Sequence, residues 1–411
     1  MRILLMIVIV MMATSMAFAQ DGSTERSGFR PDAPPYAIRG PYPVGFRALT
    51  TGTGTDALAV AVWYPALNAD GLEEKITYPA IPAKFEGMPA DQVMPSYGHA
   101  LQDAVADLSG GPYPLVIYSH GFAGHSYGTA YLLEHLASQG FVVLAPDHLE
   151  IWDPLYKDIP MSSVQRPLAI RQTIAFGEVL TADGGALAGM IDTDTIAVVG
   201  HSYGGFTSLL MGGARFDFEA LKATCAPLAP DHTIGVVCAP LLEKQAEMAQ
   251  MAGLDAVPQG LWPSWGDPRI KAIVPMAAET ELIGAAGLAE IKVPVLLING
   301  TGDQTVPLEW GATPTWEYIG SSRKASVLFA NADHSAIVAS CSDFPWPLAI
   351  GWFAGCSDPV WDLDRAHDLY DHFITAFLLA ELKGDAQARA ALQPEAVSFP
   401  GISYEAVGYS D

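Results

Sequence analysis

The chain has 411 residues, half of them hydrophobic and 16% charged, which is ample apolar material for one large core. Its 45 acidic residues outnumber its 21 lysines and arginines, giving a formal net charge of −24. Nucleic acid and anionic lipid both require a basic face on their partners, so this charge balance argues against either.

Residues 1–19 have the pattern of a cleavable export signal. Arg2 precedes an apolar run that ends in AFA at positions 17–19, before polar residues begin. The alternative is an uncleaved membrane anchor, because the run approaches the lower length limit of a transmembrane span. No later stretch has eighteen consecutive apolar residues. We therefore expect an exported protein, periplasmic or extracellular, with no stable membrane anchor.

Short apolar runs alternate with helical patterns through residues 20–411. The expected strands are, in chain order, Asp56–Ala66, Pro114–Ser119, Phe141–Asp147, Thr195–Gly200, Ile270–Met276, Val293–Gly300 and Ala325–Asn331. Most are near-continuous apolar runs, as expected for parallel strands buried on both faces. Helices are expected between them, and an amphipathic helix at about 362–382 after the last strand. This alternation predicts a single α/β domain with a mostly parallel, doubly wound sheet.

One interval breaks the alternation. More than fifty residues, about 213–268, separate the helix after Ser202 from the strand at Ile270. Loops of that length are uncommon in compact domains unless they have a function. We interpret the interval as a cap inserted over the site; the alternative is a surface excursion unrelated to substrate.

The four cysteines form an even set, which suggests disulfide bonds in an exported chain. Of the three possible connectivities we favour the local one, Cys225–Cys238 and Cys341–Cys356. Each bond would close a short loop and contribute roughly 2–4 kcal/mol to stability. No C-x-x-C is present and histidines do not cluster beside the cysteines, so no metal site is expected.

The pentapeptide GHSYG occurs twice, at 124–128 and at 200–204. A nucleophilic serine in a G-x-S-x-G motif needs a tight turn between a strand and a helix, with small residues around it. The second copy follows the strand TIAVVG directly and continues into a helical pattern. In the first copy four residues, 120–123, separate the strand from the motif, which puts Ser126 near a helix start. Ser202 is therefore the predicted nucleophile.

The segment SHGFAG, 119–124, follows the strand where such a site places half of its oxyanion hole. We expect the backbone N–H of Phe122 to supply one donor. The N–H of Tyr203, the residue after the nucleophile, would supply the second.

A serine nucleophile needs a base, and the base needs an orienting acid. His334 follows the strand Ala325–Asn331, and Asp303 follows the strand Val293–Gly300. Both should act from the same sheet edge as Ser202, in the order serine, acid, histidine. Glu279 and Asp333 are rival acids. Two other histidines, His367 and His372, fall on the late helix, where solvent-facing roles are expected.

Aromatic residues gather in the segments that should surround this site. They could line an apolar pocket, or they could belong to the core of the cap. These candidate pocket residues are Trp152, Trp262, Trp265, Phe344 and Trp346.

The stretch from about 112 to 335 resembles the α/β-hydrolases. The segments SHGFAG to APDH (119–148), RPLAIRQTI (166–174) and IDTDTIAVVGHSYGG (191–205) are similar to the branch of platelet-activating-factor acetylhydrolases and predicted dienelactone hydrolases. A likeness to cutinase-like polyester hydrolases is also present. The acid differs in place from that of the animal acetylhydrolases, and serine stands where true dienelactone hydrolases have cysteine.

The resemblance implies an α/β-hydrolase fold and a secreted serine carboxylic ester hydrolase without a cofactor. Its partner would be a small-molecule or polymeric ester. A phospholipase or lipase, a polyester hydrolase, a serine peptidase and an inactive binding protein are the alternatives. No P-loop, G-x-G-x-x-G dinucleotide motif or H-E-x-x-H zinc motif is present. The sequence leaves the oligomeric state open.

Overall fold

A computed structural model describes residues 28–79, 81–82, 84, 93–152, 156–229 and 235–410. The predicted export signal lies outside these residues. Within the described part of the chain, every helix is too short or too polar to cross a bilayer.

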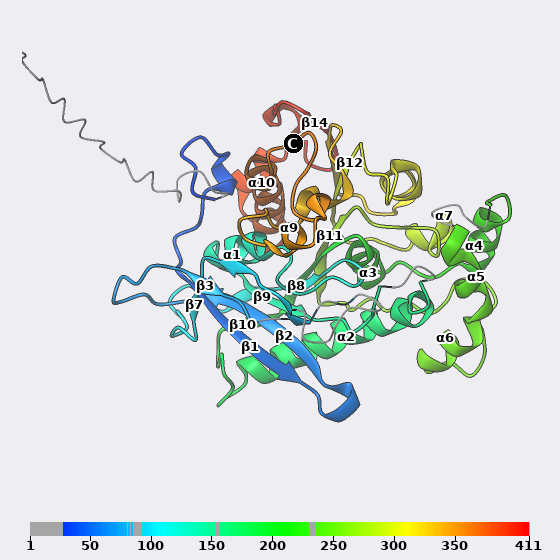
Figure 1. The fold of residues 1–411 in the computed structure, drawn as a ribbon, viewed down its shortest axis with the longest axis horizontal. Coiled ribbons are helices and arrows are strands. Elements are labelled where there is room, and N and C mark those ends of the chain that lie inside the picture. Colours follow the sequence, from blue (N-terminus) through cyan, green and yellow to red (C-terminus); the bar gives the residue numbers. More distant parts are fainter. Residues whose placement is uncertain are drawn as a thin grey trace, which may run out of the picture.

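A ten-stranded sheet forms the centre of the molecule, in the order β14-β13-β12-β11-β10-β8-β9-β2-β1-β7 (Figure 1). The strands from β9 to β13 pair in parallel, whereas β2 pairs with β1 and β9, and β14 with β13, in antiparallel fashion. Two further two-stranded sheets, β3-β6 and β4-β5, lie outside it. The main-sheet strands are β1 (Val44–Thr51), β2 (Leu58–Pro65), β7 (Leu101–Gln102), β8 (Tyr113–Ser119), β9 (Val142–Pro146), β10 (Ile191–His201), β11 (Ile270–Met276), β12 (Val295–Gly300), β13 (Lys324–Phe329) and β14 (Ile402–Val407). The short strands are β3 (Ile76–Thr77), β4 (Ile81–Pro82), β5 (Val93–Met94) and β6 (Tyr97–Gly98).

Helices cover both faces of this sheet. Successive residues of a strand point to opposite faces, so along β8 Val116 and Tyr118 join the core beneath α1 and α10, while Leu115 and Ile117 join the core beneath α2 and α3. The helices are α1 (Ala130–Ser138), α2 (Ile159–Thr181), α3 (Tyr203–Met211), α4 (Phe218–Cys225), α5 (Gly235–Glu243), α6 (Gln245–Met251), α7 (Gly284–Leu288), α8 (Ala312–Tyr318), α9 (Trp346–Ala349), α10 (Leu363–Leu382) and α11 (Ala386–Ala391). The predicted doubly wound α/β architecture is confirmed.

The last strand is not where the sequence pattern placed it. β14 follows α10 and pairs at the sheet edge with β13, and β1 precedes the first expected strand. Every residue of β14 is half-buried or exposed, in strict alternation. An edge strand of this kind has no continuous apolar run, which is the signal that identified the inner strands.

Residues 213–268 carry the helices α4, α5 and α6, which lie together at one end of the molecule beside α2 (Figure 1). A disulfide joins Cys225 at the end of α4 to Cys238 in α5. A second disulfide joins Cys341 to Cys356 and encloses α9. This is the local connectivity expected from the sequence.

Candidate active site

The turn between β10 and α3 holds Ser202 with a φ of 56° and a ψ of −123°. A non-glycine residue adopts such a left-handed φ only when its surroundings enforce it. A Cβ atom on Gly200 would lie 2.1 Å from the carbonyl oxygen of Gly204, and one on Gly204 would lie 1.8 Å from that of Ser119. Only glycine fits at either position, which is the close packing that the GHSYG motif predicts for a nucleophile.

Three side chains meet in a line at this turn. The Oγ of Ser202 lies 2.9 Å from His334 Nε2, and His334 Nδ1 lies 2.7 Å from Asp303 Oδ2. Because a carboxylate only accepts, Nδ1 carries the proton and Nε2 is free to accept from the serine hydroxyl. Burial alone would lower the pKa of His334, but the hydrogen bond and charge of Asp303 outweigh it and raise this pKa above 6.5.

The two rival acids lie elsewhere. Asp333 accepts a hydrogen bond from the backbone N–H of His334 at 2.7 Å and so caps the short helix that carries the histidine. Glu279 lines the cavity beside the triad, and burial raises its pKa to about 7. The carboxylate next to His334 Nδ1 is that of Asp303.

The segment after β8 passes directly beside Ser202. A Cβ atom on Gly121 would lie 3.4 Å from the Cβ of Ser202. From the other side, Tyr203 is the first residue of α3, so its N–H is among those that the helix carbonyls leave unpaired. The rings of Phe122 and Tyr203 meet edge to face at 5.6 Å. The two N–H groups expected to form an oxyanion hole thus belong to segments that flank the serine.

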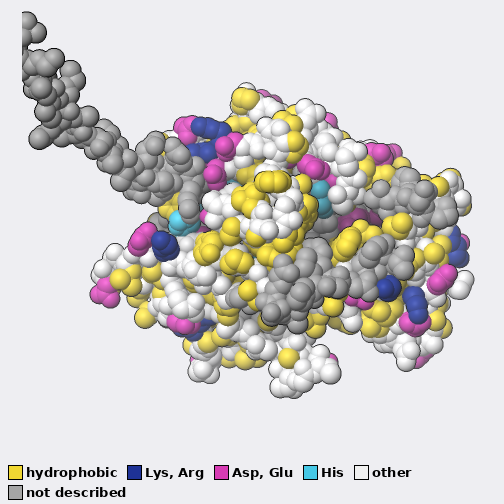
Figure 2. All heavy atoms as spheres, viewed as in Figure 1, with side chains coloured by type: hydrophobic (Ala, Val, Ile, Leu, Met, Phe, Trp, Pro, Cys, Tyr) yellow, Lys and Arg dark blue, Asp and Glu magenta, His cyan; other side chains and the backbone are white. Residues whose placement is uncertain are grey.

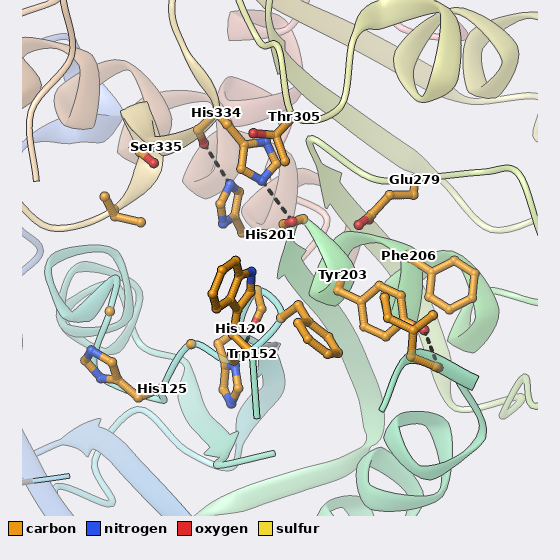
Figure 3. Close-up of a pocket in the computed structure, with 18 of the residues that line it drawn as sticks. His120, His125, Trp152, His201, Tyr203, Phe206, Glu279, Thr305, His334 and Ser335 are labelled. Carbon is orange, nitrogen blue, oxygen red and sulfur yellow. Dashed lines mark hydrogen bonds between the residues drawn. The ribbon is translucent and has the colours of Figure 1, made fainter. Parts of the chain in front are cut away.

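A cavity of about 440 Å³ opens at the triad (Figure 3). Ser202 and His334 lie in its wall, together with Trp152, Phe344 and Trp346. Tyr156 and Trp352 extend the aromatic lining, and Val237 and Leu241 of α5 contribute to it from the inserted segment.

Comparisons with known proteins agree with this architecture. A family model described as PET hydrolase-like matches residues 106–264, and one described as platelet-activating factor acetylhydrolase, isoform II, matches residues 30–152. The chain has the α/β-hydrolase fold.

Curated relatives of this chain include three cutinases from Thermobifida. Cutinase est2 of Thermobifida alba is 33% identical over 120 residues, which is 29% of this chain and 35% of the relative. Cutinase 1 of Thermobifida cellulosilytica is 31% identical over 29% of this chain and 40% of its own length. The cutinase of Thermobifida fusca (strain YX) is 31% identical over 29% of this chain and 35% of its own length. The matches therefore span well under half of each relative.

Two of the candidate pocket residues have a different place in the structure. Trp262 and Trp265 are buried and do not line the cavity. Both pack against Phe216, with ring centroids 5.5 and 4.6 Å apart. The core alternative therefore applies to this pair, because the chain returning to β11 folds under the inserted helices instead of over the cavity.

The expectation of solvent-facing histidines on the late helix is wrong. His367 and His372 are 1% and 4% exposed, and burial lowers the pKa of His367 to about 3 and of His372 to about 4. The ring of His367 stacks on Tyr131 at 3.7 Å, and His372 Nδ1 accepts from the N–H of Tyr36. α10 is covered on both sides, by α1 and by the segment that precedes β1.

A buried cation that no sequence pattern had indicated fixes the loop after β8. Arg166 of α2 is 1% exposed and donates to the carbonyl oxygens of His120 and Gly121 at 2.5 and 3.0 Å. It also forms an ion pair with Glu150. Arg166 therefore fixes the backbone of residues 120–121, directly before Phe122. The available signal was an arginine within the conspicuous segment RPLAIRQTI.

His201 fixes the other side of the site. Its Nε2–H donates to the backbone carbonyl of His334 at 2.9 Å, and burial lowers its pKa to about 3. The neutral ring of His201 therefore fixes the loop that carries His334 without adding a charge beside it.

Proposed function

We propose that this chain is a serine carboxylic ester hydrolase that works through an acyl-enzyme. The observation that carries the proposal is the unbroken hydrogen-bonded line from Ser202 through His334 to Asp303 at an apolar cavity. The similarity to cutinases, which are ester hydrolases by name, supports the same reaction class.

In this mechanism His334 Nε2 takes the hydroxyl proton as the Oγ of Ser202 attacks the ester carbonyl carbon. The oxyanion that forms accepts from the N–H groups of Phe122 and Tyr203. Collapse of the tetrahedral intermediate breaks the bond to the alcohol oxygen, which receives the proton from His334. Water then attacks the acyl-enzyme by the same steps and releases the acid.

The surroundings of the cavity favour an ester with a large apolar part. Figure 2 shows hydrophobic side chains gathered at the middle of one face, around the segment between Cys341 and Cys356. Apolar surface of this kind suits contact with an apolar substrate. The exposed apolar side chains of this segment are Leu348, Ile350, Trp352 and Phe353. Lipid and polyester substrates both fit this description, and the substrate panel described below distinguishes them.

We also propose that residues 213–268 form a cap and that the protein is exported. The cap is supported by Val237 and Leu241, which reach the cavity from α5. Export is supported by the two disulfide bonds, which persist in oxidising compartments, and by the signal expected at residues 1–19.

The two serines of the GHSYG motifs provide the test. Ser202→Ala should lower the hydrolysis of p-nitrophenyl acetate at least about a thousandfold, because a triad acts as a unit. Ser126→Ala is the matched control: that serine precedes α1 by several residues and should leave most activity. A fluorophosphonate probe should label Ser202, and labelling at Ser126 would overturn the assignment.

A substrate panel separates the reaction classes. Esters of graded acyl length, a phospholipid and a polyester should include hydrolysed members, whereas a peptide panel should not be cleaved. Peptide cleavage without ester cleavage would replace the esterase proposal by the peptidase alternative. No turnover and no probe labelling would leave a binding protein.

A further inference from the structure

Two glutamates lie in the cavity beside the triad and take no part in it. Glu279 and Glu281 follow β11, and both line the cavity. The Oε2 of Glu279 and the Oε1 of Glu281 are shielded from solvent and have no hydrogen-bond partner among the described residues. Figure 3 shows the carboxyl end of Glu279 directed from the Phe206 side toward the hydrogen bond of His334.

A shielded carboxylate oxygen without a partner is unfavourable, because the group loses its hydration and gains nothing in return. Burial raises the pKa of Glu279 to about 7, and burial together with the charge of Glu279 raises the pKa of Glu281 to about 8. Buried polar atoms in folded proteins nearly always have a partner, which is a protein group, a water molecule or a bound ion.

No lysine or arginine of the described residues pairs with Glu279 or Glu281 in the cavity. Neither lysine nor arginine is found among the residues that line the cavity within the described ranges. Arg166 acts on Glu279 through space, but its guanidinium is already bonded to Glu150 and to the carbonyls of the loop after β8. The base His334 directs its two ring nitrogens at Ser202 and Asp303.

We infer that Glu279 and Glu281 form a subsite for an ammonium group, so that the preferred ester carries a cationic alkylammonium in its acyl or its alcohol part. The inference rests on the proposed function and deepens it. An ammonium group would favour the ionised form of both glutamates and so lower their raised pKa values, whereas one hydroxyl group would satisfy only one oxygen. The formal net charge of −24 also favours the approach of a cation.

Other residues of the cavity lining fit the apolar part of such a ligand. Phe122, Tyr156 and Trp152 line the same cavity. Aromatic faces attract the positive charge of an alkylammonium group and also make apolar contacts with its methyl groups. Leu282, which follows Glu281, adds an aliphatic contact.

Matched esters that differ only in charge test the subsite. One pair places the group in the alcohol: choline butanoate and 3,3-dimethylbutyl butanoate. The other places it in the acyl part: p-nitrophenyl 4-(trimethylammonio)butanoate and p-nitrophenyl 5,5-dimethylhexanoate. In at least one pair, kcat/KM for the cationic ester should exceed that for its neutral isostere by about tenfold or more. The pair that shows this preference identifies which half of the ester faces the glutamates.

The double variant Glu279→Gln with Glu281→Gln should bring that ratio to about one, since the amides keep the shape and remove the charge. Glu290→Gln is the matched control, because Glu290 lies on the surface facing Arg215 and should leave the ratio unchanged. Labelling of Ser202 by a fluorophosphonate verifies that each variant is folded.

Binding to Ser202→Ala separates the subsite from catalysis. Calorimetry should detect choline but not 3,3-dimethylbutanol, and the two glutamine substitutions should abolish the choline signal. Hydrolysis of the neutral esters with no preference for either cationic ester would overturn the subsite and leave the proposed function intact. Choline binding in a protein that hydrolyses none of the four esters would support the subsite and overturn the proposed function.

Discussion

Asp303 is held by more than its histidine. Its Oδ1 accepts from the N–H groups of Thr305 and Val306 at 2.9 and 2.8 Å, and its Oδ2 receives Nδ1–H of His334. The side chain is 2% exposed. Two backbone donors thus fix one oxygen and aim the other at the imidazole, which keeps the tautomer that accepts from Ser202.

Asp303→Asn should therefore lower kcat about 10³- to 10⁴-fold without unfolding the protein. The raised pKa of His334 would also fall, since the charge that raises it is gone. A histidine acts as a base only when neutral, so activity is lost as the pH falls through its pKa. The residual activity of the variant should consequently persist to lower pH than that of the parent. A pH profile of kcat/KM measures both effects.

The opposite result would identify another acid. Full activity in Asp303→Asn together with loss of activity in Glu279→Gln would transfer the role to Glu279. An unmoved acidic limb in Asp303→Asn would show that the pKa of His334 is set by other groups.

At the level of elements, the strands that the sequence predicts correctly are those buried along most of their length. β8, β12 and residues 196–200 of β10 are buried on both faces and appear in the sequence as nearly continuous apolar runs. The tight turn at Ser202 was predictable because only glycine fits at positions 200 and 204, and the sequence shows glycine at both. Asp303 and His334 could be proposed because strand ends share one sheet edge.

Other features depend on contacts that sequence spacing does not reveal. β14 is a half-exposed edge strand and has no continuous apolar run. The burial of His367 results from Tyr131, more than two hundred residues away along the chain. The missing hydrogen-bond partner of Glu279 Oε2 could not be predicted from the sequence either. It depends on Arg166 donating its hydrogen bonds to other groups.

The two disulfide bonds tie different elements to the cavity. Cys225–Cys238 holds α4 against α5, and α5 carries Val237 and Leu241 into the lining. Replacing both cysteines by serine should raise KM for an octanoate ester more than for an acetate ester, because only the long acyl chain needs the cap. Equal losses on the two esters would mean that the inserted helices are structural and that the cap proposal is wrong.

The Cys341–Cys356 disulfide is expected to affect kcat instead of KM. It closes the segment that begins soon after His334 and contains Phe344 and Trp346. Loss of this bond should misplace the base and lower kcat on both esters. Kinetics of the two double variants on acetate and octanoate esters measure the difference.

At the scale of the whole molecule, residues 28–43, which precede β1, pack against the helices α1 and α10. Gly28 N–H donates to Asp368 Oδ1 at 2.9 Å, and Arg30 Nη2 lies 2.5 Å from Asp368 Oδ2. His135 Nε2–H of α1 donates to the carbonyl of Tyr36 at 2.8 Å. The segment therefore joins α1 to α10 on the face of the sheet opposite α2.

Arg30→Leu tests how much this closure contributes to stability. Arg30 is 9% exposed and Asp368 1%, so the substitution leaves a buried carboxylate without its cation. Loss of one partner of a buried pair costs about 3–5 kcal/mol, and urea denaturation should show a decrease of this order in the free energy of unfolding. Arg365→Leu is the matched control, since Arg365 pairs with Asp32 in solvent and its loss should leave the urea midpoint unchanged. Both substitutions make the already negative chain more negative by one charge, so the difference between them isolates the buried pair. Equal destabilisation by the two variants would instead assign the effect to repulsion across the whole molecule.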